Sequence, residues 1–410
     1  MIVLASLFLL KFIDLISALI LISSVLVIVV LKYLNTVEKR PILGVYRLPA
    51  RGYCLKVAIF FVVLHFRKIV RVIKGKCLGR LDYFQYEKPQ KLSFHEQAID
   101  AVYFNGNNKQ GDVLIMGTAR RQGGLINGFI YLKIENSEFG LLELPKQPDT
   151  CLYQDKEIQE FAVENIKIES VEPMKAWKLT YKGLMKKHNN PSETFSVEID
   201  ATWRSDLPFF DFDTDVDILS MAKAIALEKW NKDYFKILKE VHQTHYEQFG
   251  VMESTVKIDG KNYFSKFDTV RDHTFGNHRN WRYFHRYAMH FISVENGDRL
   301  MAVSICAPIS FSTLDLGYFY SKSDNKIYPV NSSDFRLHQH GETGKIPVDY
   351  GFTVTAGGKN YVIQVKVKES PSFYIGEEHE AKIVEMFSNF KINGKNGWGV
   401  AEFQYYNFKK

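Results

Sequence analysis

The 410-residue sequence predicts a mainly β protein, with two consecutive antiparallel β-barrels or sandwiches joined by a helical connector. Aromatic residues make up 14% of the chain, with 31 Phe and 22 Tyr, and aromatic side chains favour strands. From residue 81 onward, short apolar runs alternate with turn residues at regular spacing, a pattern typical of sandwiches and barrels. Two helical segments, a transmembrane helix and an interfacial helix, are expected to precede this β region.

The strand pattern is interrupted once. Several runs alternate with period two, as in Tyr361 to Val367, but apolar residues recur at helical spacing from Asp217 to about His245. That helical segment divides the β region into two parts. We therefore expect a transmembrane anchor at 1–34, a basic juxtamembrane segment with an interfacial helix at 35–80, a first β domain at 81–215, a helical connector at 216–248 and a second β domain at 249–410.

The anchor is predicted from Leu15 to Leu31, which carries no charged residue and is long enough to cross a bilayer as a helix. A cleaved signal peptide fits less well, because no basic segment precedes the apolar core and no A-x-A site follows it. Basic residues follow the span, from Lys32 to Arg51, and such residues stay on the cytosolic side. We expect a single-pass protein of the endoplasmic reticulum or another endomembrane, with its body in the cytosol.

The interfacial helix is predicted after the anchor. The apolar run Val57 to Phe66 is too short to span a bilayer, and the residues after it alternate between basic and aliphatic. Ile69, Val70, Val72 and Ile73 would face lipid, as in helices that lie on a membrane surface. The alternative is a core helix with a solvated basic end. The basic side chains expected to reach lipid headgroups are Arg67, Lys68, Arg71, Lys74 and Lys76.

The net charge of +7 is unevenly distributed. Residues 1–80 hold thirteen Lys or Arg and two Asp or Glu, so the rest of the chain is mildly acidic. An acidic body argues against nucleic acid as a partner, which usually requires a basic face. A basic N-terminal segment favours the surface of a lipid bilayer as a partner.

The densest polar stretch runs from Thr269 to Arg286, T-V-R-D-H-T-F-G-N-H-R-N-W-R-Y-F-H-R, with apolar strand-like runs on both sides. A polar loop or strand end on a β scaffold is a common place for a binding or catalytic site. The alternative is a buried salt-bridge knot, in which Asp272 would satisfy Arg271, Arg279 or Arg282. The sequence leaves both interpretations open.

A second polar cluster lies at His242 to Gln248, where His245 and Glu247 could form an acid/base pair or cap a helix. A few polar groups in an aromatic pocket are the usual design of a site for an apolar ligand. The acidic run from Asp211 to Asp217 lacks the Gly and the distal Glu of an EF-hand loop. We therefore interpret it as a solvated segment that leads into the following helix. We expect neither a metal nor a cofactor.

Four segments carry a resemblance to a known superfamily. The residues H-Y-E-Q at 245–248, V-K-I-D-G-K-N-Y at 256–263, R-D-H-T-F-G-N-H-R-N-W at 271–281 and G-W-G-V-A-E-F at 397–403 resemble the carotenoid hydratase (hydroxyneurosporene synthase) and AttH-like superfamily. Its motif has the form R-D-H-S-[WF]-G-x-R-x-W. The present chain has one residue more before Arg279. The resemblance implies two consecutive lipocalin-like barrels and an isoprenoid-like substrate.

The resemblance also suggests roles for the polar clusters. Asp272 and His273 would form an acid/base pair, and Arg271 and Arg279 would fix charge. The implied function is binding of an isoprenoid-like or other lipid between or within the barrels, with hydration or isomerisation as its chemistry. A non-catalytic lipid carrier or scaffold is the alternative, so whether the chain is an enzyme stays open. The remaining pocket residues would be His245, Tyr246, Glu247, Gln248 and Trp281.

The N-terminal half resembles a second group. L-S-F-H-E-Q-A-I-D-A-V-Y-F-N-G at 92–106 and G-T-A-R-R-Q-G-G-L-I-N-G at 117–128 are similar to the leading region of invertebrate phosphoenolpyruvate-synthase-like proteins. In those proteins phosphotransfer domains follow, but the printed residues contain no ATP-grasp or phosphohistidine segment. We therefore expect no phosphotransferase activity from these residues. An accessory role beside a separate phosphotransferase chain is a further alternative.

Overall fold

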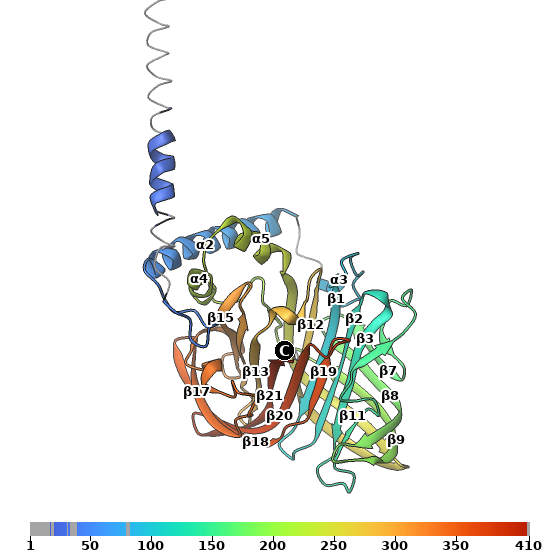
Figure 1. Ribbon diagram of the computed structural model, residues 1–410. Helices are drawn as coiled ribbons and strands as arrows, with labels where there is room; N and C mark the ends of the chain where they lie inside the picture. The colour runs from blue at the N-terminus through green and yellow to red at the C-terminus, as the bar shows by residue number, and fades with distance from the viewer. Residues whose placement is uncertain (1–16, 18–19, 31, 33–38, 79–82, 408–410) are drawn as a thin grey trace, which may run out of the picture.

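Two β-sheets lie side by side in the computed structural model, which describes residues 17, 20–30, 32, 39–78 and 83–407 (Figure 1). The side chains of residues 74–83 are outside this description. One sheet has 12 strands and the other has 9. The prediction of a mainly β protein is therefore confirmed.

The first sheet closes on itself, because β9 pairs with both β8 and β11. The closed ring runs through β11, β12, β1, β2, β3, β4, β8 and β9. Its strands, with the short ones outside the ring, are β1 (Ile99–Asn107), β2 (Val113–Arg121), β3 (Leu125–Lys133), β4 (Leu141–Glu143), β5 (Cys151–Tyr153), β6 (Phe161–Val163), β7 (Ile166–Glu172), β8 (Ala176–Lys187), β9 (Asn190–Arg204), β10 (Phe210–Asp211), β11 (Gln243–Ile258) and β12 (Lys261–Gly276).

The second sheet closes through pairing of β18 with β20, which leaves only β19 outside the ring. We call the two closed sheets the first and the second barrel. The strands of the second barrel are β13 (Arg286–Val294), β14 (Arg299–Ala307), β15 (Phe311–Ser321), β16 (Lys326–Ser333), β17 (Asp349–Ala356), β18 (Lys359–Glu369), β19 (Ser372–Ile375), β20 (Ala381–Ile392) and β21 (Lys395–Tyr406).

The chain changes barrels later than residue 249, where the sequence placed the start of the second β domain. Strands β11 and β12 complete the first barrel between β9 and β1, so the change falls between Gly276 and Arg286. The helical segment forms as α4 (Ile218–Leu227), which Asp217 caps, and α5 (Lys232–Glu240). Both helices are an excursion within the first barrel, because the strand that follows them returns to that sheet.

Tight turns fix the register of the last hairpin in each barrel. Asp259 and Gly260 join β11 to β12 with φ of 45° and 85°, and Asn393 and Gly394 join β20 to β21 with φ of 48° and 82°. Two consecutive residues with positive φ define the turn whose twist matches that of a β-hairpin. Register, and therefore which side chains face which way, is set by these turns.

Apolar side chains fill both barrel interiors. Trp177, Trp203 and Phe104 are fully buried inside the first barrel, and Phe335 and Phe352 lie in the core of the second. Two further apolar clusters lie between the barrels and join them. Asp268 of β12 also bonds to Arg299 and to Trp398 Nε1 across this junction.

Helix α2 (Tyr53–Leu78) lies over one end of the two barrels, next to α4 and α5 (Figure 1). Phe60 packs against Trp230 and Phe235, and Lys56 Nζ donates to the backbone oxygen of Glu228. The remaining short helices are α3 (Tyr83–Tyr86), η1 (Gln122–Gly124), η2 (Trp281–Tyr283) and η3 (Leu337–Gln339).

The predicted transmembrane anchor falls partly on residues outside those described. Residues 20–30 are helical. Within the described ranges, however, no helix combines the length and the apolar character that crossing a membrane requires. The described residues therefore do not support this part of the predicted fold.

Candidate functional site

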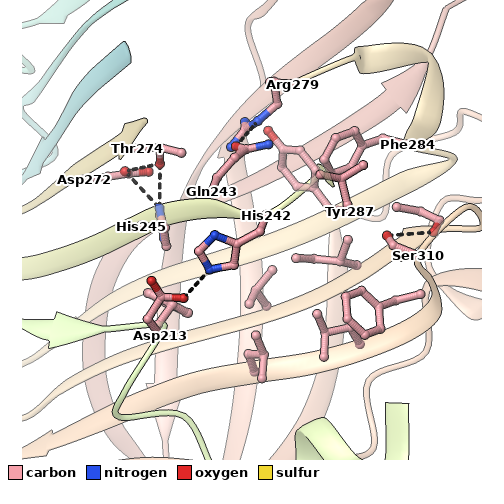
Figure 2. Close-up of a pocket in the computed structure, with 18 of the residues that line it drawn as sticks. Asp213, His242, Gln243, His245, Asp272, Thr274, Arg279, Phe284, Tyr287 and Ser310 are labelled. Carbon is pink, nitrogen blue, oxygen red and sulfur yellow. Dashed lines mark hydrogen bonds and ion pairs between the residues drawn. The ribbon is translucent and has the colours of Figure 1, made fainter. Parts of the chain in front are cut away.

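A cavity of about 780 Å³ lies between the two barrels. Strands β1, β2 and β12 of the first barrel and β13, β14 and β15 of the second supply its walls, and α2 and α4 line one end. Most of its lining is apolar, while His245, Asp272, Arg279 and Tyr287 form a polar region (Figure 2). A cavity of this size and character matches the general properties of small-molecule sites. Its main apolar residues are Met289, Phe291, Met301, Val303, Leu314 and Leu316.

The alternation of side chains along β12 separates the polar stretch into two sets. Successive residues of a strand point to opposite faces of its sheet. Arg271 and His273 are buried inside the first barrel, whereas Asp272 and Thr274 line the cavity. The expected acid/base pair of Asp272 and His273 is therefore not brought together.

The inward set forms a buried network that closes the first barrel. Arg271 Nη1 lies 2.8 Å from Glu87 Oε1, and Tyr246 Oη donates to the same oxygen at 2.6 Å. The Arg271 guanidinium also donates to Gln248 Oε1 at 2.8 Å. Burial raises the pKa of Glu87, but attraction to Arg271 and the hydrogen bonds that Glu87 accepts outweigh burial and lower this pKa. Arg271, Tyr246 and Gln248, predicted as ligand-binding, are thus part of a structural network.

His273 belongs to the same network. Its Nδ1 lies 2.9 Å from Tyr246 Oη and its Nε2 lies 2.8 Å from Asp100 Oδ1. Asp100 in turn pairs with Arg120 at 2.7 Å. Every one of these groups is buried, and each has a polar partner. The salt-bridge knot considered from the sequence therefore exists, but Glu87 and Asp100 are its acids and Asp272 is not.

The outward set surrounds His245 of β11. Its Nδ1 lies 2.6 Å from Thr274 Oγ1 and 3.2 Å from Asp272 Oδ1 (Figure 2). Its Nε2 lies 3.1 Å from Glu247 Oε1. Thr274 Oγ1 also donates to Asp272 Oδ1 at 2.9 Å. Sequence analysis selected His245, Glu247 and Asp272 from two separate segments, and the β11–β12 hairpin brings them together.

The charges in this set follow from its contacts. Burial by itself would lower the pKa of His245, but Asp272 and Glu247 outweigh burial and raise it to about 10. Attraction to His245 lowers the pKa of Asp272 against the effect of burial. Burial raises the pKa of Glu247. The His245 side chain is therefore an imidazolium held against a carboxylate.

The same three residues are the metal-ligand candidates of the described chain, because their ligand atoms all lie within 4.8 Å of one another. Both ring nitrogens of His245, however, already contact oxygen atoms. An imidazolium that donates through both nitrogens explains these contacts without a metal.

A second acid pair, which sequence analysis missed, lies across the cavity. Glu385 of β20 and Glu402 of β21 are directly opposite in register and both buried. Tyr287 Oη donates to Glu402 Oε1 at 2.5 Å, and Tyr103 Oη donates to Glu385 Oε1 at 3.2 Å. No described Lys, Arg or His forms an ion pair with either glutamate. A glutamate within an apolar strand, as in I-V-E-M-F, was the signal available in the sequence.

The pKa values of both carboxyl groups are raised. Burial is the main cause, and nearby carboxylates add to it. The pKa of Glu402 rises to about 7, and that of Glu385 rises well above its usual value. Glu402 lines the cavity, so a partly protonated carboxyl group faces it near neutral pH.

Arg279 and Trp281, predicted as ligand-binding, both line the cavity. Arg279 Nε donates to Gln243 Oε1 at 2.6 Å, and its guanidinium stacks 5.3 Å from the Trp281 ring centroid. Burial lowers the pKa of Arg279. Arg279 follows Gly276 by three residues, so the additional residue noted in the sequence motif lies in the loop beyond β12.

Basic residues of α2 line the end of the cavity nearest that helix. Arg67, Lys68 and Arg71 belong to the lining, and Arg71 Nη1 donates to the Asp213 backbone oxygen at 2.6 Å. Lys74 and Lys76 lie in the same helix, but their side chains are outside those described. The opposite side of α2 exposes apolar side chains, namely Leu55, Ile59, Val62, Phe66, Ile69 and Ile73.

The chain belongs to a protein family described as a family of unknown function (DUF8627), which it matches over residues 19–405. No curated protein matches it. Among solved structures it is similar to kievitone hydratase from Nectria haematococca, with 12% identity and a TM-score of 0.49, over 78% of this chain and 91% of that one.

Two further solved structures are similar. An AttH-type protein (NE1406) from Nitrosomonas europaea has 10% identity and a TM-score of 0.40, with 78% of this chain and 99% of that one covered. CghA has 8% identity and a TM-score of 0.43, with 79% and 95% covered. An AttH-type protein is thus among the structures similar to this chain, as the sequence resemblance predicted.

Proposed function

We propose that this member of the family of unknown function binds a lipophilic small molecule in the cavity between its two barrels. The observation that carries the proposal is the cavity itself, with about 780 Å³ enclosed mainly by aliphatic and aromatic side chains. Apolar walls favour burial of an apolar ligand, and a few polar groups fix its orientation. Both barrel interiors are filled by their own cores, so the junction is the favoured place for a ligand.

A membrane surface is the proposed source of the ligand. One side of α2 lines the cavity and carries Arg67, Lys68 and Arg71, and the opposite side exposes a stripe of large apolar residues. This combination is typical of helices that lie at the interface of an anionic bilayer. A ligand leaving the bilayer under α2 would pass directly into the cavity.

Proton transfer to the bound ligand, as in hydration or isomerisation, is a second candidate function. The observation that favours it is the buried Glu402 carboxyl in the cavity wall, whose pKa lies at about 7. A general acid works best when its pKa is close to the working pH. The alternative from the sequence, a non-catalytic carrier, would use the same cavity without this chemistry.

Native mass spectrometry of the full-length protein, extracted in detergent, tests the binding function. Wild-type protein should carry a co-purified lipid. Ala101→Trp and Ala119→Trp, which place a large ring in the cavity wall, should lose it, because both alanines line the cavity. Ala162→Trp, on β6 and outside the lining, is the matched control and should retain the lipid. Equal occupancy in all four proteins would contradict the cavity as the binding site.

Isotope labelling separates an enzyme from a carrier. Hydration in H₂¹⁸O should add labelled water to the co-purified compound, and isomerisation in D₂O should add deuterium. Glu402→Gln should abolish the mass change while the compound still binds. A compound whose mass never changes would identify a carrier.

Vesicle binding tests the membrane proposal. Replacement of Arg67, Lys68 and Arg71 by Gln should weaken binding to vesicles that contain phosphatidylserine, by on the order of 1 kcal/mol for each charge. Binding to neutral phosphatidylcholine vesicles should change little. Equal binding of wild type and variant to anionic vesicles would contradict the proposal.

A further inference from the structure

We propose that the cavity is built for a lipophilic carboxylic acid, whose carboxylate forms an ion pair with Arg279. This inference rests on the proposed binding function and specifies the chemical class of its ligand. The remainder of the ligand would occupy the apolar region between the barrels.

The contacts of Arg279 leave most of its guanidinium without a partner. Its Nε donates to Gln243 Oε1 at 2.6 Å, and no described side chain or backbone oxygen accepts from Nη1 or Nη2. The guanidinium carbon lies 5.3 Å from the Trp281 ring centroid and 5.9 Å from that of Phe284, and these two rings are themselves in contact. Both rings and the guanidinium line the cavity, and Figure 2 shows Arg279 and Phe284 there.

The three fully buried arginines of the described chain each pair with a carboxylate, whereas the partly buried Arg279 does not. Arg120 has Asp100 at 2.7 Å, Arg271 has Glu87 at 2.8 Å and Arg286 has Glu342 at 2.8 Å. By contrast, no carboxylate among the described residues lies within ion-pair distance of Arg279. Because burying an unpaired charge is costly, a partner from outside the chain is expected at this position.

The acids nearest to Arg279 do not supply that partner. Asp272 is already held by His245, which carries the compensating charge. Glu402 Oε1 accepts a hydrogen bond from Tyr287 Oη, and its pKa of about 7 keeps much of this carboxyl group neutral. The positive charge of Arg279 is therefore left for the ligand.

A second donor stands beside the guanidinium. Trp281 is 8% exposed, lines the cavity and has no hydrogen-bond acceptor for its Nε1 among the described residues. A carboxylate has two oxygens and can accept from a guanidinium and a neighbouring N–H together.

The charge of the ligand's head group follows from the cation beside it. Arg67, Lys68 and Arg71 line the end of the cavity nearest α2. Beside Trp281, the Arg279 guanidinium compensates a single negative charge, and the nearby carboxylates would repel a second one. A phosphate ester, which carries up to two charges, fits less well than a carboxylate. The planar fork of arginine also matches the geometry of a carboxylate.

Fluorescence titration with cis-parinaric acid and its methyl ester tests the inference on the full-length protein. The two probes share a polyene chain and differ in charge. At about pH 6, wild type should bind the acid at least about tenfold more tightly than the ester, because charge-assisted hydrogen bonds form only with the carboxylate. Arg279→Gln should bind both probes with the affinity that wild type has for the ester.

Two more variants control for charge and folding. Arg282→Gln removes an arginine three residues along, which pairs with Glu378 outside the cavity lining, and should keep the full preference for the acid. Arg279→Lys keeps the positive charge but loses the planar guanidinium, and it should retain part of the preference for the acid.

The outcomes separate the inference from the function on which it rests. Equal affinity of wild type for acid and ester would overturn the carboxylate inference while leaving the cavity as a lipid site. An acid preference that survives in Arg279→Gln would overturn the role of Arg279. Failure of wild type to bind either probe would count against both proposals.

Discussion

The last hairpins of the two barrels, β11–β12 and β20–β21, each carry a pair of carboxyl groups, but the two pairs have different neighbours. Each turns through two residues with positive φ, and each places two carboxyl groups directly opposite one another. The pair is Glu247 and Asp272 in the first barrel, and Glu385 and Glu402 in the second. All four groups lie at the junction between the barrels.

What differs is the neighbour of each pair. His245 stands between Glu247 and Asp272, so a positive charge compensates that pair. Tyrosine hydroxyls stand beside Glu385 and Glu402, and hydroxyls supply hydrogen bonds without charge. Like carboxylates that share a dry site cannot both ionise unless a cation joins them. The surrounding residues therefore decide whether a pair is charged or protonated, although the register is the same.

The largest expected effect comes from making the first hairpin resemble the second. His245→Gln removes the cation from between two buried acids and should lower the free energy of unfolding at neutral pH by about 3 kcal/mol or more. The loss should shrink as pH falls, because the remaining acids can then take up a proton. Denaturant unfolding at several pH values measures both effects.

The matched control for this change is His242→Gln. His242 pairs with Asp213 at 2.6 Å but is half exposed, so the expected cost is below about 1 kcal/mol. Similar losses for both histidines, or a loss at His245 that does not depend on pH, would contradict the comparison.

The raised pKa of Glu402 in the second hairpin should make the free energy of unfolding depend on pH. The pKa of Glu402 is about 7 in the fold and about 4.5 when unfolded, so the native state binds more protons between these values. The free energy of unfolding should therefore fall as pH rises from about 4.5 to about 7, by at most about 3 kcal/mol from this group. Glu402→Gln, which cannot ionise, should flatten that slope.

Glu378→Gln serves as the control, because this exposed glutamate pairs with Arg282 at the surface. Its pH profile should follow that of wild type. A Glu402→Gln protein with an unchanged slope would mean that the second pair is ionised like the first.

The smallest effect is expected from Asp272→Asn. The new amide oxygen can still accept from Thr274, and His245 keeps Glu247, so the cost should be about 1 kcal/mol, or a fall of about 2–4 °C in Tm. The pKa of His245 should fall below its value of about 10, since its nearest negative charge is lost. Thermal melting and an NMR titration of His245 test these expectations. A fall near 10 °C would identify Asp272 as a structural residue.

The sequence was sufficient for the fold class and for the location of the polar clusters. Period-two runs and turn residues predict many short strands, and the resemblance predicts two barrels. The clusters at 242–248 and 269–286 both reach the junction, because the hairpin pairs them in register. His245, Asp272, Arg279 and Trp281, which the sequence assigned to a site, line the cavity, and their roles stay a prediction.

The division of roles inside each cluster could not be predicted. It depends on which face of β12 points into the first barrel, and that in turn depends on where the hairpin joins β9 and β1. Glu87 pairs with Arg271, and Asp100 pairs with His273. The residues of each pair are more than 170 positions apart in sequence. Glu385 stands between apolar neighbours in I-V-E-M-F, but nothing in that segment indicates that Glu402 lies opposite it.

The unbroken pairing of β12 with both β1 and β11 restricts where residues can be inserted in this chain. Neither ladder contains a bulge, so one residue inserted within β12 would exchange Arg271 and His273 with Asp272 and Thr274 between the two faces. Insertion of a single residue would thereby turn the Asp272 carboxylate into the first barrel and turn Arg271 and His273 out of it. The additional residue relative to the superfamily motif lies after Gly276, beyond the last paired position, where it moves no side chain of the strand to the other face. Insertions in related chains should be found in that loop and be absent from the strand before it.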